Sequence, residues 1–154
     1  MRILDWLESI RATLLDVEKL NQEAEQLEAK LLPGGGIAMG AIGSVARDRM
    51  DPACDAAELR HKADLLGVKL EAEMSRALEV IYGRSGRGGI AKARSYTDAD
   101  ILVGYYLQGL TWIRVATEMC DGYEGSYPAQ WCRSRAMGTI ACMERIGLEA
   151  LADS

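Results

Sequence analysis

The first thirty residues repeat their apolar positions every seven residues. About four heptads with charged flanks predict one long amphipathic helix that packs along a single seam. The pattern does not identify the partner helix, because an antiparallel hairpin within the chain and a coiled-coil dimer would bury the same seam. The two positions of the repeat are filled by Ile3, Ile10, Val17, Ala24 and Leu31 and by Trp6, Thr13, Leu20 and Leu27.

A second long helix is predicted after a glycine-rich break. Proline and consecutive glycines at 33–36 end the first helix, and residues 33–50 read as a loop. Asp51 and Pro52 suit the start of the next helix, with aspartate as its cap. Its apolar stripe, in steps of three and four, comprises Ala56, Leu59, Ala63, Leu66, Leu70, Met74, Ala77 and Ile81. Residues 1–82 are therefore expected to form a helical hairpin or oligomerisation region.

Residues 83–96 are rich in glycine and basic side chains and contain no acid. The repeated glycines predict a break after the second helix. One interpretation is a flexible arm that touches phosphates through Arg87 and Arg94. The favoured interpretation is a linker that joins two modules, and both roles can coexist.

The remaining segment, 97–154, predicts three short helices separated by short breaks. The expected caps and breaks are Thr97 or Asp98, Gly109, Thr111, the turn at 121–125 and Ser126. Pro128 would fall in the first turn of the third helix, where its missing N–H costs nothing.

The third of these helices has the most informative pattern. At about 100° per residue, one apolar edge fixes which side faces the core. That edge comprises Ala129, Cys132, Ala136, Ile140 and Met143. The opposite side carries Tyr127, Gln130, Trp131, Ser134 and Gly138, with Arg133 and Arg135 on the two shoulders.

Such a helix is suited to the major groove of duplex DNA. Glutamine can bond an adenine through two hydrogen bonds, arginine can bond a guanine likewise, and flanking arginines can hold phosphates. The candidate DNA contacts are Tyr127, Gln130, Trp131, Arg133, Ser134 and Arg135, joined by Arg87 and Arg94 of the preceding segment.

Composition narrows the class of protein. The net charge of −5 is unusual for a nucleic-acid binder, but local charge decides what a surface attracts. The N-terminus lacks signal-peptide features, no apolar run could cross a bilayer, and a cytoplasmic protein is expected.

The four cysteines have no metal-ligand spacing and are predicted to be small buried hydrophobes. No nucleophile with a base, paired carboxylates or nucleotide loop is recognisable, so neither catalysis nor a cofactor is expected.

The segment LVGYYLQGLTWIRVATEMCDGYEGSYPAQWCRSRAMGTI resembles the sigma-region-4-like helix-turn-helix of ArpU-like and related phage transcriptional regulators. The resemblance rests on a tyrosine-rich first helix, a Thr-Trp entry to the second helix and the triplet Arg135-Ala136-Met137. It implies a sequence-specific regulator of phage or prophage type that binds double-stranded DNA in a bacterial host. RNA polymerase is a further partner, and the N-terminal helices could form a homodimer.

Two other functions fit the same sequence. One is a helical interaction protein that binds RNA polymerase or another regulator through the hairpin and Trp131, without reading bases. The other is a phage DNA-packaging subunit of small-terminase type. Trp131 is the decisive residue, because a buried tryptophan would mean that the predicted DNA face points into the core.

Overall fold

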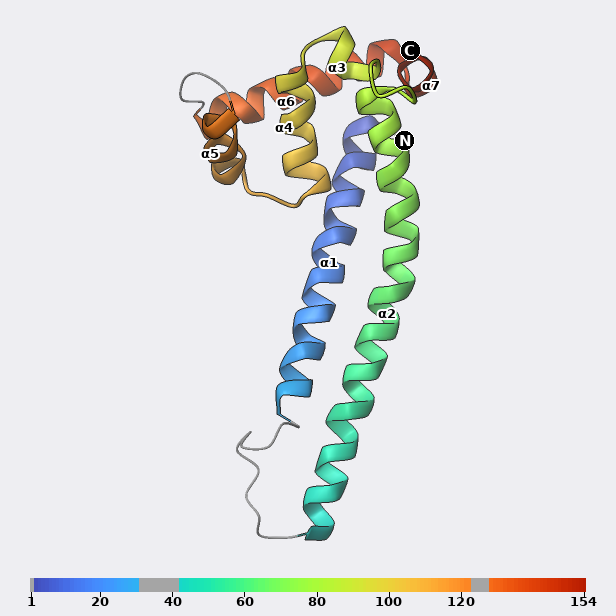
Figure 1. The fold of residues 1–154 in the computed structure, drawn as a ribbon, viewed down its shortest axis with the longest axis vertical. Coiled ribbons are helices and arrows are strands. Elements are labelled where there is room, and N and C mark those ends of the chain that lie inside the picture. Colours follow the sequence, from blue (N-terminus) through green and yellow to red (C-terminus); the bar gives the residue numbers. More distant parts are fainter. Residues whose placement is uncertain (1, 31–41, 123–127) are drawn as a thin grey trace. The chain divides into compact units, whose positions relative to one another are not determined.

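The computed structural model describes residues 2–30, 42–122 and 128–154, and in these ranges all the secondary structure is helical. The chain divides into two compact units, one of Met1–Leu14 with Leu70–Ser154 and one of Leu15–Lys69, which we call unit 1 and unit 2. The helices are α1 (Ile3–Ala29), α2 (Ile42–Tyr82), α3 (Gly89–Ala93), α4 (Tyr96–Leu102), the π-helical η1 (Val103–Leu107), α5 (Trp112–Gly122), α6 (Ala129–Ile146) and α7 (Leu148–Asp153) (Figure 1).

Unit 2 is an antiparallel pair formed by the second part of α1 and the first part of α2. Ala24, Ala56 and Ala63 are buried between the two helices, where small side chains allow a close approach. Arg60 donates two hydrogen bonds, of 2.7 and 2.8 Å, to the Glu28 carboxylate. This contact lowers the pKa of Glu28 and raises that of Arg60. The two side chains are 41% and 45% exposed, so solvent screens the pair and it contributes little to stability.

The long helix α2 begins earlier than the sequence predicts. It is helical from Ile42, so the expected loop at 33–50 is wrong from that residue on, and residues 33–41 lie outside the described part. Pro52 therefore lies inside the helix instead of starting it. The stretch 45–50 contains no glycine and includes good helix formers, which allows the helix to continue across a proline that removes one backbone hydrogen bond.

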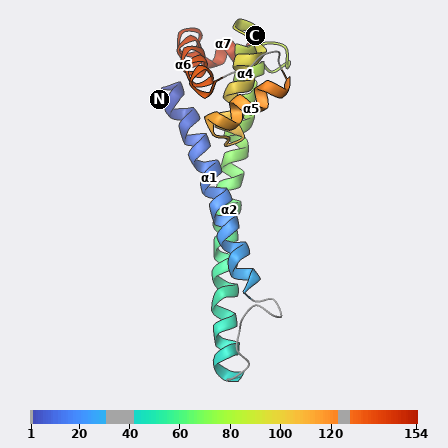
Figure 2. The same ribbon diagram turned by 90° about the vertical axis from the view of Figure 1, so that its left-hand side faces the viewer.

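In unit 1 the first turns of α1 pack against the end of α2. Ile3, Trp6 and Ile10 are buried, as the heptad pattern predicts. The Trp6 indole N–H donates to Glu73 Oε2 at 2.6 Å. In unit 2, α1 runs alongside α2 (Figures 1 and 2). Of the two arrangements that the sequence left open, the described residues form the hairpin within one chain. It buries Ile3, Trp6, Ile10 and Ala24 of the α1 seam and leaves the other described seam residues partly exposed.

The segment predicted as a linker at 83–96 belongs to unit 1 and is packed in part: Gly83 is buried, whereas residues 84–87 are exposed. Gly88 to Ala91 are buried, and the Gly89 N–H donates to Ser154 Oγ at 2.7 Å. Gly89 has a φ of +64°, and a β-carbon there would lie 2.6 Å from backbone atoms of Ile81. The glycines thus allow a tight turn after α2, because only a residue without a side chain fits so close to the neighbouring backbone.

The three helices predicted after residue 96 are present, with different caps. Ser95, and not Thr97 or Asp98, caps α4: its Oγ accepts the Asp98 N–H at 3.1 Å. Gly109 has a φ of +72° after η1, and Thr111 accepts the Arg114 N–H at the start of α5, as expected. Helix α5 continues to Gly122, so the turn expected at 121–125 is wrong for residues 121 and 122, and residues 123–125 lie outside the described part.

Helix α6 starts two residues later than expected from a cap at Ser126. Pro128 is its N-cap residue, not a member of its first turn, and the predicted cap Ser126 lies outside the described residues.

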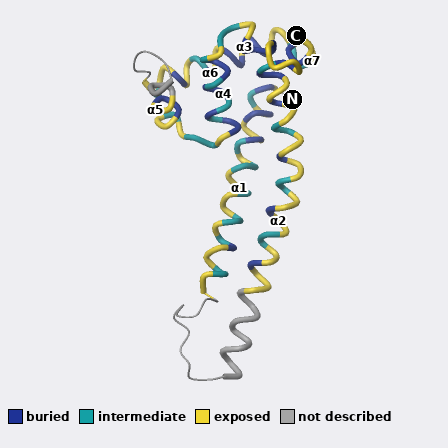
Figure 3. Tube along the Cα trace, viewed as in Figure 1, coloured by how far each residue is buried: buried dark blue, intermediate teal, exposed yellow. Residues whose placement is uncertain are grey.

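The predicted core edge of α6 is confirmed at four of its five residues, because Ala129 at the start of the helix is only half-buried. Cys132, Ala136 and Met143 are fully buried, Ile140 is 5% exposed, and Figure 3 shows the burial along the chain. Cys142 is also buried, but Cys54 is exposed on α2, so the prediction of a buried hydrophobe is wrong there. Within the described ranges, no helix has the length and apolar character needed to cross a membrane.

Candidate functional site

The outer face of α6 is exposed, as the rotation derived from the sequence requires. Gln130, Ser134 and Gly138 face solvent, and Trp131 is 36% exposed although it is a large aromatic residue. Ala136, on the other side of the helix, has no exposed surface. The helix therefore presents a polar surface with one aromatic side chain, backed by a closely packed core edge.

A buried carboxylate joins this helix to α4. Asp98 is 1% exposed and accepts two hydrogen bonds from Arg135, at 2.9 Å from Nε and 2.6 Å from Nη2. Arg94 Nε donates to the same carboxylate at 3.2 Å. We call these three residues the Asp98 clamp. Burial of a carboxylate requires such partners, and hydrogen bonds from charged donors are roughly twice as strong as neutral ones.

The clamp places Arg94 against the outer face of α6. A β-carbon at Gly138 would lie 3.3 Å from Arg94 Nη1 and 3.7 Å from Nη2, so the guanidinium rests where a side chain would otherwise stand. The Arg135 guanidinium lies 5.7 Å from the centre of the Trp131 ring. Two arginines from distant parts of the sequence thus lie next to the exposed residues of α6, both held by one aspartate.

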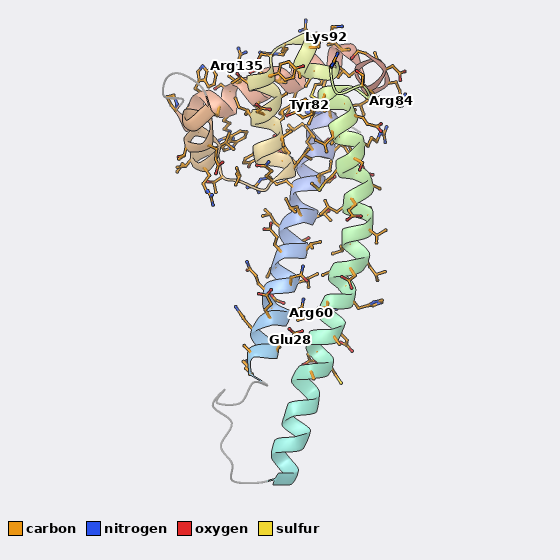
Figure 4. The ribbon with its side chains drawn as sticks, in the orientation of Figure 1. Glu28, Arg60, Tyr82, Arg84, Lys92 and Arg135 are labelled. Carbon is orange, nitrogen blue, oxygen red and sulfur yellow. The ribbon has the colours of Figure 1, made fainter. Side chains whose placement is uncertain are left out.

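The charge on this part of unit 1 is positive although the whole chain is acidic. Helix α6 contains three arginines and one glutamate, and that glutamate, Glu144, accepts the Ile3 N–H at 2.6 Å. Two arginines share one carboxylate in the Asp98 clamp, which leaves a net positive charge. Lys92 of α3 is exposed, and it lies with Arg135 at the end of unit 1 drawn at the top of Figure 4. These residues therefore carry more positive than negative charge, which favours an anionic ligand on this side of α6.

Arg133 lies on the other edge of α6, beside a cavity. The cavity has a volume of about 240 Å³ and is lined by Glu8, Tyr105, Tyr106, Trp112, Arg133 and Met137. Tyr105 stacks on Trp112 with ring centres 3.8 Å apart. Arg133 is exposed, so it is available on this edge, whereas Arg135 on the opposite edge is engaged by Asp98.

Tyr106 should ionise at a higher pH than an exposed tyrosine. Burial, and secondarily the negative charge of Glu8, raise its pKa from 10.0 to about 12. The folded protein then holds a proton that the unfolded chain has lost, so the free energy of unfolding falls as pH rises from about 10 to about 12 and is unaffected by this group at lower pH. A titration of phenolate absorbance should show an ionisation step near pH 12. This step should be lost in Tyr106→Phe and retained in Tyr96→Phe. A late step that persists in Tyr106→Phe would contradict the assignment.

The structure brings together only part of the predicted DNA-contact set. Gln130, Trp131 and Ser134 share one face with Arg94 and Arg135. Among the other predicted contacts, Tyr127 lies outside the described residues, and Arg87 is exposed in the turn before α3 with no described contact to α6.

Sequence reasoning missed the role of Asp98, which it considered only as a cap. The four-residue spacing from Arg94 was a readable signal for an ion pair, but nothing in the sequence connects Asp98 with Arg135.

No family model, curated protein or solved structure matches this chain.

Proposed function

We propose that this chain is a sequence-specific DNA-binding transcriptional regulator of phage or prophage type. In this proposal α5 and α6 act as a helix-turn-helix, with α6 as the recognition helix in the major groove. The main support is the exposed face of α6, where Gln130, Trp131 and Ser134 stand beside the two arginines of the Asp98 clamp. The resemblance of the segment 102–140 to ArpU-like regulators points the same way.

Each group on this face has a defined role in the proposal. Gln130 and Ser134 donate and accept hydrogen bonds at base edges, which discriminate sequence. Arg135 uses Nε and Nη2 for Asp98, so Nη1 is the atom it offers to a phosphate. Holding an arginine in place before DNA arrives reduces the side-chain entropy that binding would otherwise cost. The phosphate contacts position α6, and the polar side chains read the bases.

The first test is selection from a random duplex library, followed by fluorescence anisotropy on the selected sequence. Affinity is expected to fall linearly with salt on logarithmic axes, because each neutralised phosphate releases counterions. The selected duplex should bind more tightly than a scrambled one. Failure to enrich any sequence, together with equal affinity for both duplexes, would remove specific recognition from the proposal.

A second test assigns the face. Gln130→Ala should cost about 1–3 kcal/mol on the selected duplex and less on the scrambled one. Arg133→Ala should weaken both and reduce the salt slope by about one. Lys19→Ala removes a positive charge from an exposed position on α1 and serves as the matched control. If Lys19→Ala and Arg133→Ala have equal effects, binding depends on net charge and not on α6.

The alternative is a protein partner such as RNA polymerase, and one observation favours it. Trp131 is exposed on α6 and Ile113 is 72% exposed on α5, which gives the helix pair apolar side chains that a protein surface could cover. This function would be supported if purified RNA polymerase binds the chain at high salt and if Trp131→Ala abolishes that binding. A packaging subunit of small-terminase type would instead show a ring-sized mass by light scattering.

A further inference from the structure

The cavity beside Arg133 is not used by the proposed DNA contact, although Arg133 at its edge belongs to both. Residues of α1, η1, α5 and α6 line it, and its volume is about 240 Å³. Cavities for drug-sized ligands measure about 300–1,000 Å³, so this one suits a smaller molecule. Aromatic walls with a few polar groups are the usual form of such a site.

The η1 segment places two consecutive tyrosines, Tyr105 and Tyr106, at this cavity. It is a π-helical turn, a rare conformation that occurs frequently at functional sites. The Tyr105 ring stacks on Trp112, and the Arg11 guanidinium lies 4.2 Å from the centre of the same ring. These contacts hold the aromatic wall in place before any ligand binds.

Two opposite charges line the cavity without pairing. They belong to Glu8 and Arg133, and among the described residues neither side chain forms an ion pair or a hydrogen bond. Burial is the main reason for the raised pKa of Tyr106. The charge of Glu8 adds to that rise and the charge of Arg133 opposes it, so both charges lie near the Tyr106 ring. The cavity therefore offers one carboxylate and one guanidinium to a ligand.

Tyr106 adds a hydroxyl group to these charges. The residue is 1% exposed, and its hydroxyl has no hydrogen-bond partner in the part of the chain that the structure describes. Polar groups in buried side chains are in most cases hydrogen-bonded, because losing water without gaining a partner is costly. A polar atom of a ligand in the cavity would bond this hydroxyl.

The paired charges select for a zwitterion. An anion would be attracted by Arg133 and repelled by Glu8, and a cation would meet the reverse. A molecule with one carboxylate and one ammonium group satisfies both. Trp112, Tyr105 and Met137 offer aromatic and apolar contact to the rest of it. We infer that the cavity binds a free aromatic α-amino acid, with its carboxylate on Arg133 and its ammonium group on Glu8.

Isothermal titration calorimetry of the full chain tests this site, with L-phenylalanine, L-tyrosine and L-tryptophan as probes. Two analogues of L-phenylalanine keep the phenyl ring and lack one charge each: phenethylamine has no carboxylate, and 3-phenylpropanoate has no amine. Each analogue is expected to bind at least about tenfold more weakly than L-phenylalanine, because one charge-assisted contact is lost.

Two variants assign the charges. In Glu8→Gln the preference for the ammonium group should disappear, so L-phenylalanine and 3-phenylpropanoate should bind alike. In Arg133→Gln the preference for the carboxylate should disappear, so L-phenylalanine and phenethylamine should bind alike. Glu18→Gln is the matched control: it is the same substitution at an exposed glutamate of α1 that does not line the cavity, and binding should be unchanged.

Either of two results would overturn the inference. One is that none of the three amino acids binds at millimolar concentration. The other is a preference over an analogue that survives in the variant lacking the matching charge. The site goes beyond the proposed function, and all these measurements are made without DNA, so the two proposals can fail separately.

Discussion

Replacing Ala136 by glutamate is expected to unfold unit 1. Ala136 has no exposed surface and lies on the core edge of α6 between Cys132 and Ile140. A glutamate there would bury a charge with no partner and would need space that close packing does not leave. We expect a loss of more than about 4 kcal/mol in the free energy of unfolding, the range reached only by a few severe mechanisms. Circular dichroism during thermal and urea unfolding measures it.

The matched control is Ala141→Glu, the same substitution on the exposed side of α6. Its free energy of unfolding should stay within about 0.5 kcal/mol of the wild type, as for most surface changes. The contrast between two alanines five residues apart tests the rotation of the helix itself. Equal melting curves for the two variants would mean that Ala136 does not lie in the core, and the proposed DNA face would then be wrongly assigned.

Replacing Arg135 by alanine is expected to lower the free energy of unfolding by about 2–4 kcal/mol. The substitution removes two of the three hydrogen bonds that reach the buried Asp98 carboxylate. Removing one partner of a buried ion pair typically costs about 3–5 kcal/mol, because a charge is left uncompensated. Arg135 is 40% exposed and Arg94 remains on Asp98, so we expect a loss around or below the lower end of that typical range.

The sequence placed Arg135 only on a shoulder of α6 as a candidate DNA contact, so this loss of stability follows from its contact with Asp98 in the fold. Arg133→Ala is the control: Arg133 is an exposed arginine on the same helix, and its loss should not change the unfolding midpoint. Arg135→Lys should recover part of the stability, since lysine keeps the charge but cannot form the paired hydrogen bonds. If Arg135→Ala and Arg133→Ala unfold alike, the Asp98 clamp contributes nothing to stability.

Local sequence was sufficient to predict the two long helices and the helices α4, α5 and α6, but not α3, α7 or the first turns of α2. The heptads of α1 and the stripe of α2 identify the sides that face inward, because a helix repeats its faces every 3.6 residues whatever its partner. The edge of α6 that includes Cys132 and Ala136 was predicted for the same reason. Gly109 and Thr111 marked helix ends correctly, since positive φ and side-chain capping are properties of single residues and their neighbours.

Only the tertiary structure showed the partner of each face and the partners of each charge. It resolved the α1 seam in favour of a hairpin, packed the basic turn at 83–89 against Ser154, and brought Arg94 and Arg135 to one carboxylate. Asp98 and Arg135 are 37 positions apart. Periodicity along one helix carries no information about such a contact, because it depends on how three separate helices pack. The sequence thus determined which side of α6 is exposed, and the fold determined which arginines lie next to that side.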